Sequence, residues 1–138
     1  MITSPSTLRV ADLMSLDPIT VPLDATIEEA EILMRDRRVT GLPVVDATGH
    51  LVGVISQTDI VFLAVSSVRA LIRHRSDHIR VGEVMSTPPV TIDAAATLPE
   101  AADRMTRDGI HRLVVVDDHG RPIGVLAAMD YVALAAEG

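Results

Sequence analysis

The chain repeats itself once, and this duplication constrains its fold more than any other feature of the sequence. A shift of 71 positions aligns residues 10–64 with residues 81–135 without a gap, and about 20 of the 55 pairs are identical, Asp59 with Asp130 among them. A unit of this size is only marginally stable alone. The two copies are therefore expected to fold together as one module.

Each copy predicts the same first elements. In the first copy a short β-prone run at residues 19–21 is followed by Thr26 and Glu29, whose spacing is that of a helix capping box. A helix with one buried apolar stripe is expected to begin there. The counterparts in the second copy are residues 90–92, Thr97 and Glu100.

A hairpin and a second helix follow in each copy. Asp46 opens and Gly49 closes a link between two short apolar runs, which predicts a hairpin with a type I turn. The second helix is expected over residues 58–72 in the first copy and over residues 131–136 in the second. Residues 58–72 are apolar on most faces, which is typical of a helix that packs against another subunit.

Composition excludes several kinds of partner and compartment. The formal net charge is −7, and only Phe62 and Tyr131 are aromatic, so a general nucleic-acid binder is not expected. The absence of cysteine rules out disulfides, thiolate metal sites and a thiol nucleophile. The start of the chain has no basic segment followed by an apolar run, and the most apolar region contains Asp59 and Arg69. A soluble cytoplasmic protein without membrane contact is expected.

One pair of histidines allows an interpretation as a metal site. His74 and His78 are four residues apart, as two ligands on one helical face would be, and Asp77 or His50 is the third group available. No cysteine can complete the set. A solvated connector at residues 73–80 is the simpler interpretation, and no metal site is predicted.

The same connector is basic, which raises nucleic acid or a nucleotide phosphate as a possible contact. The acidic total and the lack of aromatic residues argue against nucleic acid. Residues 117–119, which hold two Asp and one His, lie on a predicted turn and form no catalytic constellation. The sequence therefore predicts that the chain is not an enzyme. The arginines that make this region basic are Arg69, just before the connector, and Arg73, Arg75 and Arg80 within it.

The order of elements and three motifs together resemble the CBS (cystathionine β-synthase) domain. The motifs are GLPVVD at residues 41–46, GHLVGVISQTD at residues 49–59 and GIHRLVVVDDHG at residues 109–120. The resemblance implies an α/β fold of the α+β kind, with two tandem β-α-β-β-α units packed sheet to sheet in pseudo-two-fold symmetry. The implied divisions are one domain at 8–72, the connector at 73–80 and a second domain at 81–138.

In that family the clefts between two repeats hold AMP, ADP, ATP, S-adenosylmethionine or related ligands, and pairs of repeats form homodimers through their helices. By resemblance, Asp59 would accept hydrogen bonds from both ribose hydroxyls, and Ser56 and Thr58 would donate to phosphate oxygens. The start of a helix favours an anion there. The structural alternative is that Ser56 and Asp59 form only a capping box.

The second copy departs from this pattern because Ala127 and Met129 replace the two hydroxyl residues beside Asp130. Its cleft would hold a nucleoside, S-adenosylmethionine, a differently bound phosphate, or nothing. His111 and Arg112 resemble a phosphate-contacting pair in kinase-regulating members of the family, and the planar guanidinium suits phosphate. The alternative is a surface Arg and a partly buried His.

Apolar side chains and backbone groups on both repeats would supply the adenine face. The function expected is therefore a non-catalytic, ligand-sensing regulatory module whose effector is a protein on another chain, and it needs no cofactor beyond the adenosyl ligand. The alternative is a structural or interaction protein with vestigial clefts that binds its partner without ligand. The expected ligand contacts are Ile19, Thr20, Thr40, Gly41, Leu42, Pro43, Ser56, Thr58, Asp59, Val90, Thr91, His111, Arg112, Leu113, Val114 and Asp130.

Overall fold

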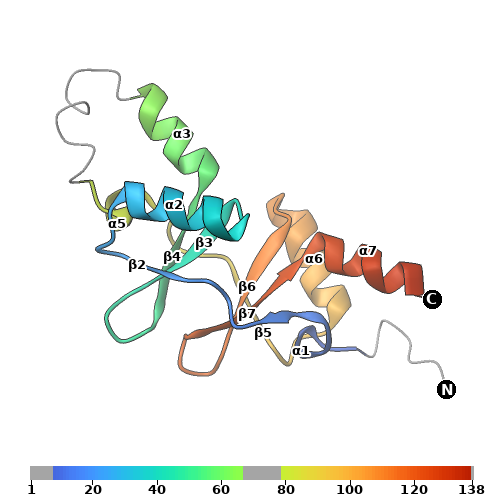
Figure 1. Ribbon diagram of the computed structural model, residues 1–138. Coiled ribbons are helices and arrows are strands. Elements are labelled where there is room, and N and C mark those ends of the chain that lie inside the picture. The colour runs from blue at the N-terminus through green and yellow to red at the C-terminus, as the bar shows by residue number, and fades with distance from the viewer. Residues whose placement is uncertain (1–7, 67–78, 138) are drawn as a thin grey trace. The chain divides into compact units, whose positions relative to one another are not determined.

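The computed structural model describes residues 8–66 and 79–137, which form two compact units (Figure 1). We call Ile19–Pro89 the first-repeat unit, because it contains the hairpin and long helices of the first copy. The described parts of Met1–Pro18 and Val90–Gly138 form the second-repeat unit. Both contain a sheet and helices, which confirms the predicted α/β fold class.

The first-repeat unit is built on a three-stranded sheet with the order β2-β3-β4. Strand β2 runs parallel to β3, and β3 runs antiparallel to β4 as the arms of the predicted hairpin. Helices α2 and α3 and the short helix α5 supply residues that pack against it. The elements are β2 Val21–Pro22, α2 Ile27–Arg37, β3 Gly41–Val45, β4 Leu51–Ser56, α3 Gln57–Ser66 and α5 Val81–Val84.

The second-repeat unit repeats this plan with one added edge strand, in the order β1-β7-β6-β5. Strand β5 is parallel to β6, whereas β7 is antiparallel to both β6 and β1. Figure 1 shows the blue N-terminal segment beside these late strands. The elements are α1 Val10–Leu13, β1 Ser15–Leu16, β5 Thr91–Asp93, α6 Leu98–Asp108, β6 Arg112–Val116, β7 Pro122–Ala127 and α7 Ala128–Glu137.

Both predicted capping boxes are present. The Glu29 backbone N–H donates to the Thr26 hydroxyl at 3.1 Å, and the Thr26 backbone N–H donates to the Glu29 carboxylate at 2.9 Å. The same two bonds join Thr97 and Glu100, each at 3.2 Å. Hydrogen bonds from the threonine hold the pKa of each glutamate below its ordinary value. The first turns of α2 and α6 are therefore fixed by the same local chemistry.

The predicted hairpin turns are also confirmed. Gly49 N–H donates to the Asp46 carbonyl at 3.0 Å, and Gly120 N–H donates to the Asp117 carbonyl at 3.1 Å. Both glycines have positive φ, +88° and +77°, a conformation that other L-residues rarely adopt. The pKa of the Asp46 carboxyl is lowered by a hydrogen bond from the Thr48 hydroxyl and then by backbone N–H groups, and that of Asp117 is lowered by backbone N–H groups.

The compact units exchange the short helices that begin the two repeats. Helix α1 begins the first repeat but packs in the second-repeat unit, where Val10 N–H donates to the Ala96 carbonyl at 2.8 Å. Helix α5 packs in the first-repeat unit, where Val81 N–H donates to the Ala25 carbonyl at 2.8 Å. Of the expected connector, Ile79 accepts a hydrogen bond from Ile27 N–H at 3.1 Å. Sequence repeats and packed units therefore divide the chain differently.

Each unit has an aliphatic core between its sheet and its helices. In the first-repeat unit the fully buried Leu42, Val44 and Ile55 from the sheet meet Ala30 from α2 and Val81 from α5. Leu113, Val115, Leu126, Ala101 and Val10 occupy the matching places in the second-repeat unit. Within residues 8–66 and 79–137, no helix combines the length and the apolar character needed to cross a membrane.

Candidate functional site

The first-repeat unit gathers its predicted polar site residues where β4 ends and α3 begins. Strand pairing sets Gly41 opposite Ser56, and Gln57 N–H donates to the Thr40 carbonyl at 2.8 Å. Thr58 is exposed in the first turn of α3, and Asp59 follows it. The start of β3 and the start of α3 thus bring these residues to one end of the sheet.

Asp59 uses both carboxylate oxygens within its own unit. Ser56 N–H donates to Oδ2 at 2.9 Å, and Asp59 N–H donates to the Ser56 hydroxyl at 3.1 Å, which completes the predicted capping box. The Ser86 hydroxyl donates to Oδ1 at 3.1 Å. A carboxylate has about four lone-pair positions, so these bonds leave acceptor capacity for a ligand. Capping and ligand binding are therefore compatible at this half-buried residue.

Ser86 is a site residue that sequence reasoning missed. Its backbone is held in place by two hydrogen bonds with Val54, from Ser86 N–H to the Val54 carbonyl at 2.9 Å and in the reverse direction at 3.1 Å. Ser86 lies 27 residues from Asp59, so no local spacing links the two. The only available signal was that Ser86 and Ser15 are an identical pair in the repeat.

The second-repeat unit places His111, Arg112 and Asp130 at the equivalent end of its sheet. Arg112 lies opposite Ala127, and Ala128 N–H donates to the His111 carbonyl at 2.8 Å. Asp130 accepts from Ala127 N–H at 2.8 Å, which is half a capping box. Within the described residues no side chain donates to Asp130. His111 and Arg112 are exposed.

The residues expected to contact adenine lie on both faces of each sheet, because successive side chains of a strand point in opposite directions. Leu42 and Leu113 are 0% and 1% exposed and lie in the aliphatic cores, so only their backbone groups remain for a ligand. Pro43 and Val114 are the next residues on their strands and point to the opposite face of each sheet. Ile19 and Val90 are equivalent residues that pack against their respective cores, and Thr20 and Thr91 follow them. Pro43 and Val114 are themselves buried, so the expected adenine contacts with partly exposed side chains are Ile19, Thr20, Val90 and Thr91.

In the described part of the chain, neither Asp59 nor Asp130 forms an ion pair. Within the described residues, no Arg or His nitrogen lies within 4.0 Å of the carboxylate of Asp59 or Asp130. No group of three metal-ligating side chains occurs in that part of the chain either. The His74 and His78 pair lies outside the described residues.

Comparison with known proteins accounts for the duplicated unit. The family model described as the CBS domain matches residues 10–66 and 81–137. Inosine-5'-monophosphate dehydrogenase of Mycobacterium leprae (strain TN) is 34% identical over 120 residues, which are 86% of this chain and 21% of that relative. The chain thus spans about a fifth of the length of this relative.

Two solved structures share the fold over nearly their whole length. The structure of CBSX2 in complex with AMP has a TM-score of 0.82 and 30% identity, and the match covers 94% of this chain and 97% of that one. The CBS domain pair of protein MJ0100, in complex with 5'-methylthioadenosine and S-adenosyl-L-methionine, has a TM-score of 0.79 and 26% identity, with coverage of 94% and 96%. The chain therefore belongs to the CBS domain family and carries two tandem copies of that domain.

Proposed function

We propose that this CBS pair is a regulatory module that binds an adenosine-containing ligand beside Asp59 and leaves it chemically unchanged. AMP, ADP, ATP and S-adenosylmethionine are the candidate ligands. The observation that carries the proposal is the polar cluster around Asp59, in which a half-buried carboxylate is oriented by Ser56 and Ser86 next to the exposed hydroxyl of Thr58.

The chemistry of this cluster suits a ribose and its 5' substituent. A carboxylate with spare lone pairs can accept from two vicinal hydroxyls, and hydrogen bonds to a charged group contribute about 1.5 to 3 kcal/mol. Burial of about 100 Å² of adenine surface would add about 3 kcal/mol. After the cost of association, a micromolar dissociation constant is expected.

The related structures support adenosine as the shared part of the ligand. CBSX2 was solved with AMP, and the MJ0100 pair with 5'-methylthioadenosine and S-adenosyl-L-methionine. These ligands have adenosine in common and differ at the 5' position. We therefore expect the adenosine to be read beside Asp59 and the 5' group to decide which ligand is preferred.

A thermal-shift panel of AMP, ADP, ATP, S-adenosylmethionine and guanosine monophosphate tests this function. At least one adenosine ligand is expected to raise the melting temperature of the wild type, because binding to the native state alone stabilises it. The Asp59→Asn variant keeps a carbonyl oxygen for the Ser56 N–H but loses the charge, so the shift is expected to disappear. If no adenosine ligand shifts the wild type, the proposal is wrong.

A second candidate function is partner binding without ligand, and the apolar surfaces of α3 and α7 favour it. Val61 and Val65 on α3 are 56% and 71% exposed, and Met129 and Val132 on α7 are 71% and 56% exposed. Such faces on a small protein are typical of contacts with another chain. A homodimer through these helices would be separated by Val61→Glu and Val132→Glu in sedimentation velocity, whereas Asp59→Asn would leave it intact.

A further inference from the structure

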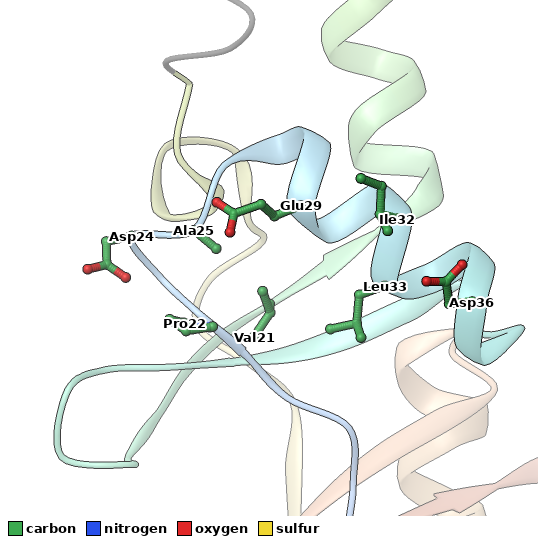
Figure 2. A pocket seen from close by; sticks show the side chains of 8 residues that line it. All are labelled: Val21, Pro22, Asp24, Ala25, Glu29, Ile32, Leu33 and Asp36. Atoms are coloured by element: carbon green, nitrogen blue, oxygen red, sulfur yellow. The ribbon is translucent and has the colours of Figure 1, made fainter.

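A groove on the first-repeat unit lies apart from the Asp59 cluster, between α2 and β2. Its cavity volume is about 490 Å³. Figure 2 shows its lining side chains, with Leu33 on α2, Val21 on β2 and Asp24 on the loop between these elements. Val21 and Leu33 are apolar, whereas Asp24, Glu29 and Asp36 place three carboxylates on the lining. A volume of this size is sufficient for side chains of a partner.

Four of the residues that line the groove lie on α2, with the spacing of one helical face. Glu29, Ile32, Leu33 and Asp36 are related as i, i+3, i+4 and i+7, so they share one face of the helix. Their order is acidic, apolar, apolar, acidic. The two acidic positions are two turns apart, about 10 Å along the helix axis. Ile32 is 40% exposed, whereas Leu33 is partly buried and packs against the core, so this stripe lies at the edge of the face that α2 buries.

These carboxylates lack basic partners in the described part of the chain. No Arg or His nitrogen there lies within 4.0 Å of the carboxylates of Asp24, Glu29 or Asp36. Arg80 donates instead to the Asp24 carbonyl at 3.1 Å, and the pKa of Glu29 is lowered by hydrogen bonds from Thr26 and, to a smaller extent, by the charge of Arg80. Asp36 forms no ion pair among the described residues, although Arg35 and Arg37 are its neighbours in the last turn of α2.

Residues at the equivalent positions on α6 of the second-repeat unit form ion pairs with other residues of the same helix. Its residues on α6 are Glu100, Asp103, Arg104 and Arg107. Arg107 pairs with Asp103, and Arg104 pairs with Asp108 through Nε at 2.6 Å. Both apolar positions of α2 are thus charged on α6. Because the two units share a fold, the acidic and apolar stripe is a property of the first-repeat unit and does not follow from the fold.

We propose that this groove docks an amphipathic helix of a partner protein that carries basic residues at both ends of an aliphatic stripe. The complementary pattern is Arg, Leu, Leu, Arg at i, i+3, i+4 and i+7. The arginines would pair with the carboxylates at the two ends, and the leucines would cover Ile32 and Leu33. Strand addition is disfavoured because β2 is only two residues long and includes Pro22, which has no N–H.

The test is fluorescence anisotropy with a labelled helical peptide of this pattern and a matched peptide with Glu in place of both Arg. The Arg peptide is expected to bind at concentrations below about 1 mM, and the Glu peptide is not. Asp36→Arg and Ile32→Asp each copy the α6 residue at the equivalent position. Each is expected to weaken binding about tenfold, because each removes one end or the apolar centre of the contact. Arg107→Ala on α6 is the control and is expected to have no effect.

Several results would overturn the proposal. These are no binding of the Arg peptide, equal binding of the two peptides, or equal binding to wild type and to both α2 variants when circular dichroism shows them folded. Displacement of the peptide by spermidine at a similar concentration would assign the groove to small polycations. Loss of a wild-type dimer in Asp36→Arg without any peptide would assign it to a second copy of the chain. Persistence of adenosine-ligand binding in Asp36→Arg would show that docking and ligand recognition are separate.

Discussion

The two units hold the same carboxylate at the same place in the same fold, but they surround it with different side chains. The Asp59 carboxylate accepts from the Ser56 backbone N–H and the Ser86 hydroxyl, and the Asp59 N–H donates to the Ser56 hydroxyl, whereas among the described residues the Asp130 carboxylate accepts only a backbone N–H. The hydrogen bond from a backbone N–H, which both aspartates accept, therefore serves to cap the start of the helix in each unit. The hydroxyl groups are the part that the first-repeat unit adds, and they mark the position where we place ligand recognition.

The largest effect is expected where the two units are alike. A Cβ at Gly53 would lie 2.6 Å from the Met85 sulfur and 2.9 Å from the Ser86 carbonyl oxygen. A Cβ at Gly124 would lie 2.7 Å from the Ser15 carbonyl oxygen. Because backbone atoms cannot yield easily, Gly53→Ala and Gly124→Ala are each expected to lower the free energy of unfolding by about 2 to 3 kcal/mol, measured by urea denaturation.

Gly41→Ala is the control for both glycine variants. The nearest atom to its added Cβ is 3.6 Å away, which is ordinary van der Waals contact, so little loss of stability is expected. A large loss in only one of Gly53→Ala and Gly124→Ala would show that the two units do not share the close approach of the strand to the residues that follow α5 or α1.

The next largest effect is on ligand affinity, and it is expected only when the hydroxyl group that donates to Asp59 is removed. Ser86→Ala removes the donor that orients Oδ1, so it is expected to weaken an adenosine ligand about fivefold, or roughly 1 kcal/mol. Ser15→Ala alters the equivalent residue of the other unit and is expected to leave that affinity unchanged. Isothermal titration calorimetry with AMP compares the two. If Ser86→Ala and Ser15→Ala weakened AMP binding equally, the proposal that only the first-repeat unit uses this hydroxyl for ligand binding would be wrong.

A smaller effect is expected from making the second-repeat unit resemble the first. The double variant Ala127→Ser, Met129→Thr restores the two hydroxyl groups beside Asp130. We expect it to strengthen ligand binding at that unit by about threefold, because each new hydroxyl adds at most one neutral hydrogen bond. The readout is the change in chemical shift of residues near Asp130 during AMP titration. Absence of any change would show that hydroxyl groups are not the limiting difference.

The smallest effect concerns the capping boxes, which the units share. Hydrogen bonds from threonine hold the pKa of Glu29 and Glu100 below the ordinary value of 4.5 in the folded state. Their contribution is therefore complete above pH 4.5 and is lost as pH falls through the lowered folded pKa. Thr26→Val and Thr97→Val are each expected to flatten slightly the dependence of unfolding free energy on pH between about 5 and 3. An unchanged slope would contradict this account.

Local patterns were sufficient for the parts of the fold that depend on residues close in sequence. The capping boxes and the Asp-to-Gly turns each arise within four residues, and the structure contains them in both units. Strand alternation was less useful without the register. It did not reveal in advance that Leu42 and Leu113 face the cores, and this fact restricts their part in any ligand contact to the backbone.

Contacts between distant residues could not be predicted from spacing. Helices α1 and α5 have four residues each, too few for a periodic pattern, and they pack beside segments far along the chain. The bond from Ser86 to Asp59 depends on that same exchange, because α5 leads the chain to Ser86 in the first-repeat unit. Sequence reasoning proposed Asp59 as a ligand contact but did not indicate Ser86, whose hydroxyl donates to its carboxylate.

The most direct test of the account is calorimetric titration of AMP into the wild type, Asp59→Asn and Asp130→Asn. Each variant keeps an amide oxygen for the backbone N–H at the start of its helix and loses only the charge. The account predicts that Asp59→Asn weakens AMP about tenfold or more, whereas Asp130→Asn changes its affinity by less than about twofold. Loss of binding in Asp130→Asn with normal binding in Asp59→Asn would contradict it.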